Sequence, residues 1–265
     1  MAAIRVVVHG VLGKMGQEVL RAVTKAPDME AVGAADRTAK TNLLSIPGDS
    51  RTIPLSSDLG AVLEETKPDV VVDFTNAEGC KSAASESIKR GVRFVSGSTG
   101  LSEAEISRIE SMAAERKVGV VLASNFALGA VVLMDLVRKA APYFDYIDII
   151  ESHHEQKIDS PSGTSLSIAR AATQSKKAFK RNRPEKQTLA GTMGGEQGGV
   201  GIHSLRQPGR SAHHEVVMGI QGQTLTLRHD VLGRDCYMPG VLAAVREVVN
   251  RKGLVVGLDK ILGLQ

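Results

Sequence analysis

The sequence predicts an α/β protein in which a mostly parallel sheet is followed by a second domain with a mixed sheet. Short β-branched runs alternate with helical patterns over about the first 125 residues, the arrangement that builds a parallel sheet. After about residue 200, strand patterns instead follow one another with hairpin signals, which indicates an antiparallel or mixed sheet. A length of 265 residues is sufficient for two domains of ordinary size.

The predicted strands of the first sheet are short and almost uninterrupted apolar runs, as expected for strands covered on both faces. Helical patterns separate them. Ser102 and Glu105, for example, form a capping box at the start of one helix. The predicted strands are 4–9, 30–35, 69–74, 93–96 and 118–123, and the predicted helices are 16–25, 57–66, 77–90 and 102–116. This alternation is typical of a doubly wound, Rossmann-like sheet, which binds ligands outside the carboxyl ends of its strands.

The pattern changes in the second half of the chain. A helix over 128–141, a strand over 146–152 and a helix over 163–175 precede a polar, Gly-rich stretch at 176–201. The strands predicted after it are 202–206, 215–220 and 224–229, and the last helix is 239–251. We therefore expect a first domain at 1–127, a second at 128–237, and a segment at 238–265 that returns to the first.

Composition excludes several classes of protein. The formal net charge of +4 suits small anionic ligands better than a nucleic acid. Cys80 and Cys236 lie far apart, which argues against a disulfide framework or a zinc site on cysteines and favours the cytoplasm. The first residues are too soon interrupted by charge for a signal peptide, and no apolar run has the length of a membrane span.

A glycine-rich turn follows the first predicted strand and opens the first helix. In such a turn, glycines let the backbone approach a pyrophosphate, and the helix N-terminus supplies free N–H groups. The spacing is GxxGxxG, a weak signal without its structural context. The residues expected to hold a dinucleotide here are Gly10, Val11, Leu12, Gly13, Lys14 and Met15.

Asp36 and Arg37 follow the second predicted strand. An acid at this place binds the ribose hydroxyls of NAD, whereas an arginine holds the 2′-phosphate of NADP. The pair therefore predicts that both NADPH and NADH are accepted. Two further turns follow strands of the same sheet and are expected to line the same edge: Gly97, Ser98 and Thr99, and Ala123, Ser124, Asn125 and Phe126.

The segment 151–164, with sequence ESHHEQKIDSPSGT, concentrates proton donors and anion-binding groups. His153 and His154 are adjacent, so on a strand they point to opposite faces and do not share a metal. A second triplet, His213-His214-Glu215, also lacks the helical spacing of a zinc motif, and we expect no metal site.

Lys157 can serve as a proton donor or as a carboxylate anchor, or it can be an ordinary surface lysine. Ser162, Gly163 and Thr164 begin the next helix, where free N–H groups and the Thr164 hydroxyl can receive a carboxylate. Simple capping of that helix by Ser162 or Thr164 is compatible with this role.

These motifs resemble those of the 4-hydroxy-tetrahydrodipicolinate reductase family, also called dihydrodipicolinate reductases. The family signature E-x-H-H-x-x-K-x-D-x-P-S-G-T is matched over 151–164, and the GxxGxMG loop over 10–16. Three further motifs match in order: Asp73-Phe74-Thr75, the turn at 97–100 and the turn at 123–126. Asn76 stands where some members have an arginine that can meet the 2′-phosphate, so the resemblance does not favour NADPH over NADH.

The resemblance implies NAD(P)H-dependent reduction of 4-hydroxy-tetrahydrodipicolinate, a cyclic dicarboxylate, to tetrahydrodipicolinate with loss of water, on the route to lysine. By position it implies that His153 is the acid–base residue and Lys157 the proton donor, and that His154, Gly163 and Thr164 bind substrate. It also implies a second domain that builds a homotetramer. Two alternatives are a different two-domain NAD(P) dehydrogenase and a dinucleotide-sensing regulator without turnover.

Overall fold

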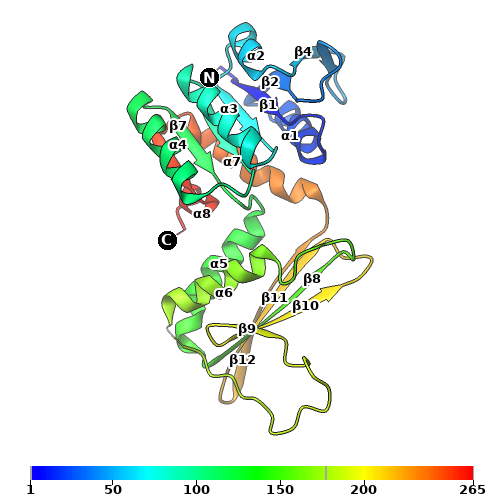
Figure 1. Cartoon of the computed structure of the whole chain (residues 1–265), viewed down its shortest axis with the longest axis vertical. Coiled ribbons are helices and arrows are strands. Elements are labelled where there is room, and N and C mark those ends of the chain that lie inside the picture. Colours follow the sequence, from blue (N-terminus) through cyan, green and yellow to red (C-terminus); the bar gives the residue numbers. More distant parts are fainter. Residues whose placement is uncertain (1, 177, 265) are drawn as a thin grey trace. The chain divides into compact units, whose positions relative to one another are not determined.

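The computed structural model describes residues 2–176 and 178–264; Met1, Lys177 and Gln265, which the expected domains include, lie outside the described residues. Within this part of the chain, residues up to 127 form one compact unit together with 237–263, and residues 128–236 form a second (Figure 1). The predicted α/β fold, a Rossmann-like parallel sheet plus a unit with a mixed sheet, is confirmed.

The first unit contains an eight-stranded sheet in the order β13-β7-β6-β5-β1-β2-β4-β3, parallel except for the β3–β4 pair. The chain runs outward from β1 in both directions, so the order reverses between β1 and β5, the place where such sheets bind ligands. The strands are β1 (Ile4–His9), β2 (Met29–Ala35), β3 (Leu43–Ser45), β4 (Thr52–Ser56), β5 (Val70–Asp73), β6 (Arg93–Ser96), β7 (Gly119–Leu122) and β13 (Gly253–Val256).

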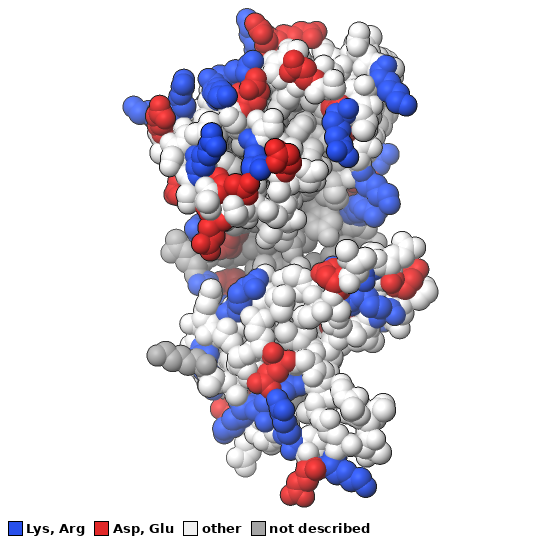
Figure 2. Space-filling view, in the orientation of Figure 1, with Lys and Arg blue, Asp and Glu red and all other residues white. Residues whose placement is uncertain are grey.

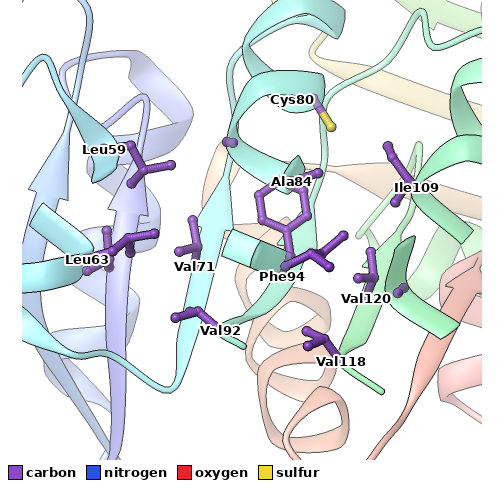
Figure 3. Close-up of a cluster of buried hydrophobic side chains, with 14 of the residues drawn as sticks. Leu59, Leu63, Val71, Cys80, Ala84, Val92, Phe94, Ile109, Val118 and Val120 are labelled. Carbon is purple, nitrogen blue, oxygen red and sulfur yellow. The ribbon is translucent and has the colours of Figure 1, made fainter. Parts of the chain in front are cut away.

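The helices of the first unit are α1 (Lys14–Lys25), α2 (Leu59–Thr66), α3 (Ala77–Lys89), α4 (Glu103–Arg116), α7 (Met238–Val248) and α8 (Leu258–Ile261). The capping box of α4 is confirmed, since the Ser102 side chain accepts from Glu105 N and Glu105 accepts from Ser102 N. Figure 3 shows part of the core between the sheet and these helices, with Phe94 of β6 beside Ala84 and near Ile109. Complete burial of a side chain such as Phe94 contributes roughly 1.5–3 kcal/mol to the free energy of folding. The packed sheet thus supports the turns at its edge.

The second unit contains a five-stranded mixed sheet in the order β12-β11-β8-β10-β9, in which only β8 and β10 run parallel. Helices α5 and α6 cover one face, where Ile147, Ile149 and Val216 meet Leu133 and Ile168 in one apolar cluster. The elements are α5 (Leu128–Ala140), β8 (Tyr146–His153), α6 (Gly163–Ser175), β9 (Gly195–Gln197), β10 (Val200–Arg206), β11 (Ala212–Ile220) and β12 (Gln223–Val231), and two short 3₁₀ turns lie at Ala141–Tyr143 and Arg234–Tyr237.

The structure corrects several sequence expectations. The last helix does not extend to residue 251: α7 ends at Val248, and Gly253, with a φ of +83°, opens strand β13. Strands β3, β4 and β9 and helix α8 were also not predicted. Strand β4 contains Pro54, and a proline argues against a strand because it cannot donate a hydrogen bond in a sheet. The other missed elements are three or four residues long, too short to show a periodic pattern.

Charged side chains of both signs are mixed on the molecular face shown in Figure 2. Many of these side chains form ion pairs with neighbours of opposite charge. Lys81, for example, pairs with both Glu78 and Glu105. Across residues 2–176 and 178–264, none of the helices combines the length and the apolar composition needed to cross a membrane.

Candidate functional site

The glycine loop lies at the carboxyl end of β1 and leads into α1. Gly10 has a φ of +80°, and a Cβ there would lie 2.7 Å from the carbonyl oxygen of Phe74. A Cβ on Gly16 would overlap the backbone of Gly10. Both positions therefore require glycine. Gly13 caps α1 without a side-chain hydrogen bond, and the first turn carries no acid, so the N–H groups of this helix end suit an anion.

Asp36 is buried directly beyond β2 and faces this loop. Its Oδ2 accepts the Leu12 N–H at 3.0 Å, and its Oδ1 accepts the N–H and the hydroxyl of Thr38. Burial acts to raise the pKa of Asp36, but these hydrogen bonds outweigh it and lower the pKa below its ordinary value. The ionised carboxylate retains capacity on Oδ2 for one more donor, while the neighbouring Arg37 is exposed.

The two other predicted turns begin at the carboxyl ends of β6 and β7. Parallel pairing of β7, β6, β5, β1 and β2 brings all the predicted cofactor residues to one edge of the sheet. The Phe126 ring is buried, with its centroid 5.7 Å from that of Phe74, and is therefore not accessible to a ligand. The Asn125 side chain accepts the Ala127 N–H. The turn therefore presents its backbone groups and the exposed Ser124.

In the second unit, β8 ends in His153, whose Nδ1 is hydrogen-bonded to the Glu151 carboxylate. Residues two apart on a strand point to the same face, so the strand itself places these side chains together. Both are buried. Burial acts to raise the pKa of Glu151, but hydrogen bonds from His153 and Arg206 outweigh it and lower the pKa to about 2. An ionised carboxylate only accepts, so His153 carries its proton on Nδ1.

Arg206, at the end of β10, forms a two-pronged ion pair with Glu151. Its two guanidinium NH groups lie 3.0 and 2.8 Å from the two carboxylate oxygens. One of them also donates to the carbonyl of Asp159, and the Ser162 N–H donates to Glu151. Glu151 is thus the anchor that joins His153, β10 and the loop 154–162.

His214 of β11 lies beside this group. Its ring meets that of His153 edge-on, with centroids 5.4 Å apart, and its Nε2 is 3.1 Å from the Ser162 hydroxyl. Burial lowers the pKa of His214 to about 4, and the nearby His153 acts in the same direction. His214 is therefore neutral near pH 7, and it packs against His153 and Ser162 without contributing a charge.

The remaining predicted residues follow in the loop and at the start of α6. His154 lies beyond the strand and is exposed, and Lys157 Nζ is 2.6 Å from Asp159 Oδ1. Ser162 is the N-cap of α6, as expected for one of two candidates, and accepts the Ser165 N–H. Gly163 is exposed with open space around it, and the first turn of α6 carries no acid. This helix end can receive a carboxylate.

Sequence reasoning missed several residues that the structure joins to these groups. Glu151 belonged to the quoted signature but received no role, and Arg206 was seen only as the end of a strand. His214 was weighed only as a metal ligand; in the described part of the chain, no cluster of His, Cys, Asp or Glu side chains is arranged to hold a metal ion. Asp73 belonged to a matched motif but received no role, and its partner His9 was missed. The local signals for these residues were the two motifs and the triplet His213-His214-Glu215.

Comparison with known proteins covers the whole chain. Family descriptions "Dihydrodipicolinate reductase, N-terminus" and "Dihydrodipicolinate reductase, C-terminus" match residues 4–126 and 129–262. A 4-hydroxy-tetrahydrodipicolinate reductase of Dehalococcoides mccartyi is 46% identical over 265 residues, with 100% of both chains covered. One from Syntrophomonas wolfei is 43% identical, with 97% of this chain and 98% of the relative covered.

Comparison with solved structures points to the same family. A dipicolinate-bound dihydrodipicolinate reductase from Paenisporosarcina sp. TG-14 is 37% identical and superimposes with a TM-score of 0.89, covering 98% of this chain and 99% of the other. An amine dehydrogenase from Mycobacterium smegmatis, 17% identical with a TM-score of 0.67 over 95% and 94% of the two chains, shares the fold alone.

Proposed function

The chain belongs to the dihydrodipicolinate reductase family, and from this membership we infer how its residues divide the work of the reaction. The reaction is the NAD(P)H-dependent reduction of 4-hydroxy-tetrahydrodipicolinate to tetrahydrodipicolinate with loss of water, in the diaminopimelate route to lysine. The observation that best supports the assignment of roles is the buried Glu151 carboxylate, which accepts hydrogen bonds from His153, from Arg206 and from the Ser162 N–H at the end of the loop that carries Lys157.

His153 is the proposed acid–base residue. Because Nδ1 donates to Glu151, Nε2 is the ring atom that accepts or returns a proton. The ionised Glu151 stabilises the imidazolium form that exists while His153 holds that proton. Glu151 and Arg206 thus position His153 without themselves exchanging protons.

Lys157 is the proposed proton donor, and it also lies where it can meet a substrate carboxylate. Its partner Asp159 is half-exposed, so an incoming carboxylate can replace it in the ion pair. His154 and the N–H groups of Gly163 and Thr164 are proposed to bind the substrate carboxylates, because an exposed imidazole and a helix N-terminus whose first turn carries no acid both favour anions.

The cofactor fits the first unit. The crowded backbone at Gly10 and Gly16 leaves a surface without side chains, and the N-terminus of α1 supplies N–H groups for a pyrophosphate. The nicotinamide cofactor supplies the hydride of the reaction. We propose that both NADPH and NADH are used, since Asp36 can accept one ribose hydroxyl and the exposed Arg37 can meet a 2′-phosphate.

We propose that the first unit binds the cofactor and the second unit binds the substrate, and that the chain has hinges near residues 126–130 and 235–240. The support for this assignment is that the predicted cofactor residues all lie within 1–127 and the predicted substrate residues all lie within 128–236. Motion at these hinges would allow the cofactor and the substrate to react.

We also propose a homotetramer, built on the face of the five-stranded sheet that α5 and α6 leave open. Ile150 and Leu205 lie on this face and are exposed in the single chain. Mutation of both to aspartate is expected to reduce the molecular mass in solution, measured by light scattering. An unchanged mass would place the interface elsewhere.

A cytoplasmic location is likewise proposed. Cys80 and Cys236 are both free thiols, which suits a reducing compartment. Fractionation of cells that express the protein, followed by detection in each fraction, tests this location.

The decisive test of the function is an assay of NADPH and NADH oxidation with the condensation product of aspartate semialdehyde and pyruvate as substrate. Oxidation should require that cyclic product and should not occur with pyruvate alone. Oxidation of a sugar or an amine instead would favour the alternative of a different two-domain dehydrogenase. Binding of dinucleotide without turnover would favour a regulator.

A further inference from the structure

Three neighbouring strands of the first unit end in polar residues that stand in one row. His9, Asp73 and Ser96 are the last residues of β1, β5 and β6, and the sheet pairs His9 with Asp73 and Asp73 with Ser96. Partners in a parallel sheet point to the same face, so the three side chains are lateral neighbours. The row crosses the position between β1 and β5 where the strand order reverses.

Asp73 is the centre of this row, and its carboxylate is fully buried. Oδ1 accepts from His9 Nδ1 at 2.8 Å and from the Thr75 hydroxyl at 2.7 Å. Oδ2 accepts from the hydroxyls of Ser96 at 2.6 Å and Ser98 at 2.7 Å. A carboxylate has about four acceptor sites, so the chain itself satisfies Asp73, and no acceptor site is left for a ligand.

Three of the four donors each hold a turn that leaves the sheet at its ligand-binding edge. His9 directly precedes Gly10, Thr75 lies in the connection from β5 to α3, and Ser98 lies in the turn after β6. The turns are also joined to one another, because the Ser98 hydroxyl accepts the Thr75 N–H at 2.9 Å. A shift of the Asp73 carboxylate would therefore disturb three turns together.

Stability alone does not explain a charge at this place. Desolvation of a buried carboxylate is costly, and apolar groups of similar volume often stabilise a core as well or better. A fully satisfied polar network instead selects one geometry of the groups around it. Here the groups around it are the turns that carry Gly10 and Ser98, two of the residues proposed to hold the dinucleotide.

We propose that Asp73 is a positioning residue for the dinucleotide: it holds the turns after β1, β5 and β6 in the geometry that receives the cofactor, without contacting the cofactor itself. The proposal rests on the cofactor site proposed above. Turns that are already ordered lose less conformational entropy when the ligand binds, so affinity depends on the network.

The test is Asp73→Asn, with Asp69→Asn as the matched control. Asp69 precedes the same strand at its opposite end, where its Oδ2 accepts the Arg5 N–H. Calorimetry should show that the Kd for NADPH rises about tenfold or more in Asp73→Asn, the size expected for one or two lost hydrogen bonds, and changes less than about twofold in Asp69→Asn. The KM for NADPH should rise in parallel, while the KM for the dicarboxylate substrate stays within about twofold of wild type.

Two milder variants keep the proposal testable if Asp73→Asn does not fold. Thr75→Val and Ser96→Ala each remove one donor and retain the carboxylate, and each should raise the Kd for NADPH about three- to tenfold. An unchanged Kd in the folded variants overturns the proposal, and so does an equal loss in Asp69→Asn. Wild-type protein that binds no dinucleotide overturns the proposed function instead.

Discussion

The Nδ1 atom of His153 donates a hydrogen bond to the carboxylate of Glu151, two residues earlier on strand β8. The same carboxylate accepts both guanidinium NH groups of Arg206. Glu151 therefore sets the orientation of the imidazole and its tautomer, and Arg206 keeps Glu151 ionised. A histidine whose proton-exchanging nitrogen is fixed in this way is prepared for acid–base work before substrate arrives.

Replacement of this carboxylate should therefore impair turnover. Glu151→Gln cannot balance an imidazolium charge, and its amide can present an N–H to Nδ1 and so favour the wrong tautomer. We expect kcat to fall about a hundredfold, within the range of general acid–base catalysis, while the Kd for NADPH changes less than about twofold. Steady-state kinetics and calorimetric titration measure the two quantities.

Asp135→Asn is the control for Glu151→Gln. Asp135 is another buried carboxylate of the second unit, paired with Arg138 and Lys139 on α5. The Asp135→Asn variant should have a lower free energy of unfolding than wild type and an unchanged kcat. If Glu151→Gln kept more than half of the wild-type kcat, the positioning role of Glu151 would be excluded.

Removal of either proposed proton-exchanging side chain should act on turnover rather than on the cofactor. His153→Ala and Lys157→Ala should each lower kcat about a hundredfold or more, with cofactor Kd unchanged. Lys186→Ala, in the exposed loop before β9, removes the same charge and should behave as wild type. Unchanged turnover in both site variants would refute the assignment of this site.

The buried His214 makes stability depend on pH. Its pKa is lowered to about 4 in the folded protein, so below its ordinary value the unfolded chain takes up a proton that the folded chain does not. The free energy of unfolding should therefore fall as pH decreases from about 6.5 towards 4, with a contribution from His214 of about 2 kcal/mol between about pH 7 and pH 5.

His214→Asn should abolish that contribution. Urea unfolding at the two pH values should give a smaller loss of stability in His214→Asn than in wild type. His154→Asn, at an exposed histidine, should lose as much as wild type. Equal losses in wild type and His214→Asn would show that His214 titrates at its ordinary pKa.

Cofactor preference should depend on Arg37. Arg37→Ala removes the exposed cation that directly follows Asp36 and should raise the Kd for NADPH about tenfold, with the Kd for NADH changed less than twofold. Arg21→Ala removes an exposed cation from α1 that pairs with Glu18, and it should leave both values unchanged. Paired calorimetric titrations provide the measurement, and a large wild-type preference for either cofactor would contradict the permissive interpretation of Asp36 beside Arg37.

Local sequence pattern was sufficient to predict the elements whose signals are formed by neighbouring residues. The Ser102 capping box and the apolar run of β1 predicted their helix and strand because each signal lies within a few consecutive residues. Strand β13 offers only three apolar residues between two glycines, Leu254, Val255 and Val256. Its residues form a strand because β7 offers a parallel edge, with Leu254 opposite Val120.

The sequence by itself determined the fold class, the glycine loop and the signature 151–164, because periodicity, glycine spacing and motif order are all properties of neighbouring residues. Only the tertiary structure decided that the Glu151 carboxylate is held by Arg206, 55 residues away, and that Asp73 accepts hydrogen bonds from the ends of β1 and β6 and from the turns after β5 and β6. The physical reason is that burial, ionisation and tautomer depend on lateral neighbours across a sheet, and sheet pairing brings together residues that no local pattern relates.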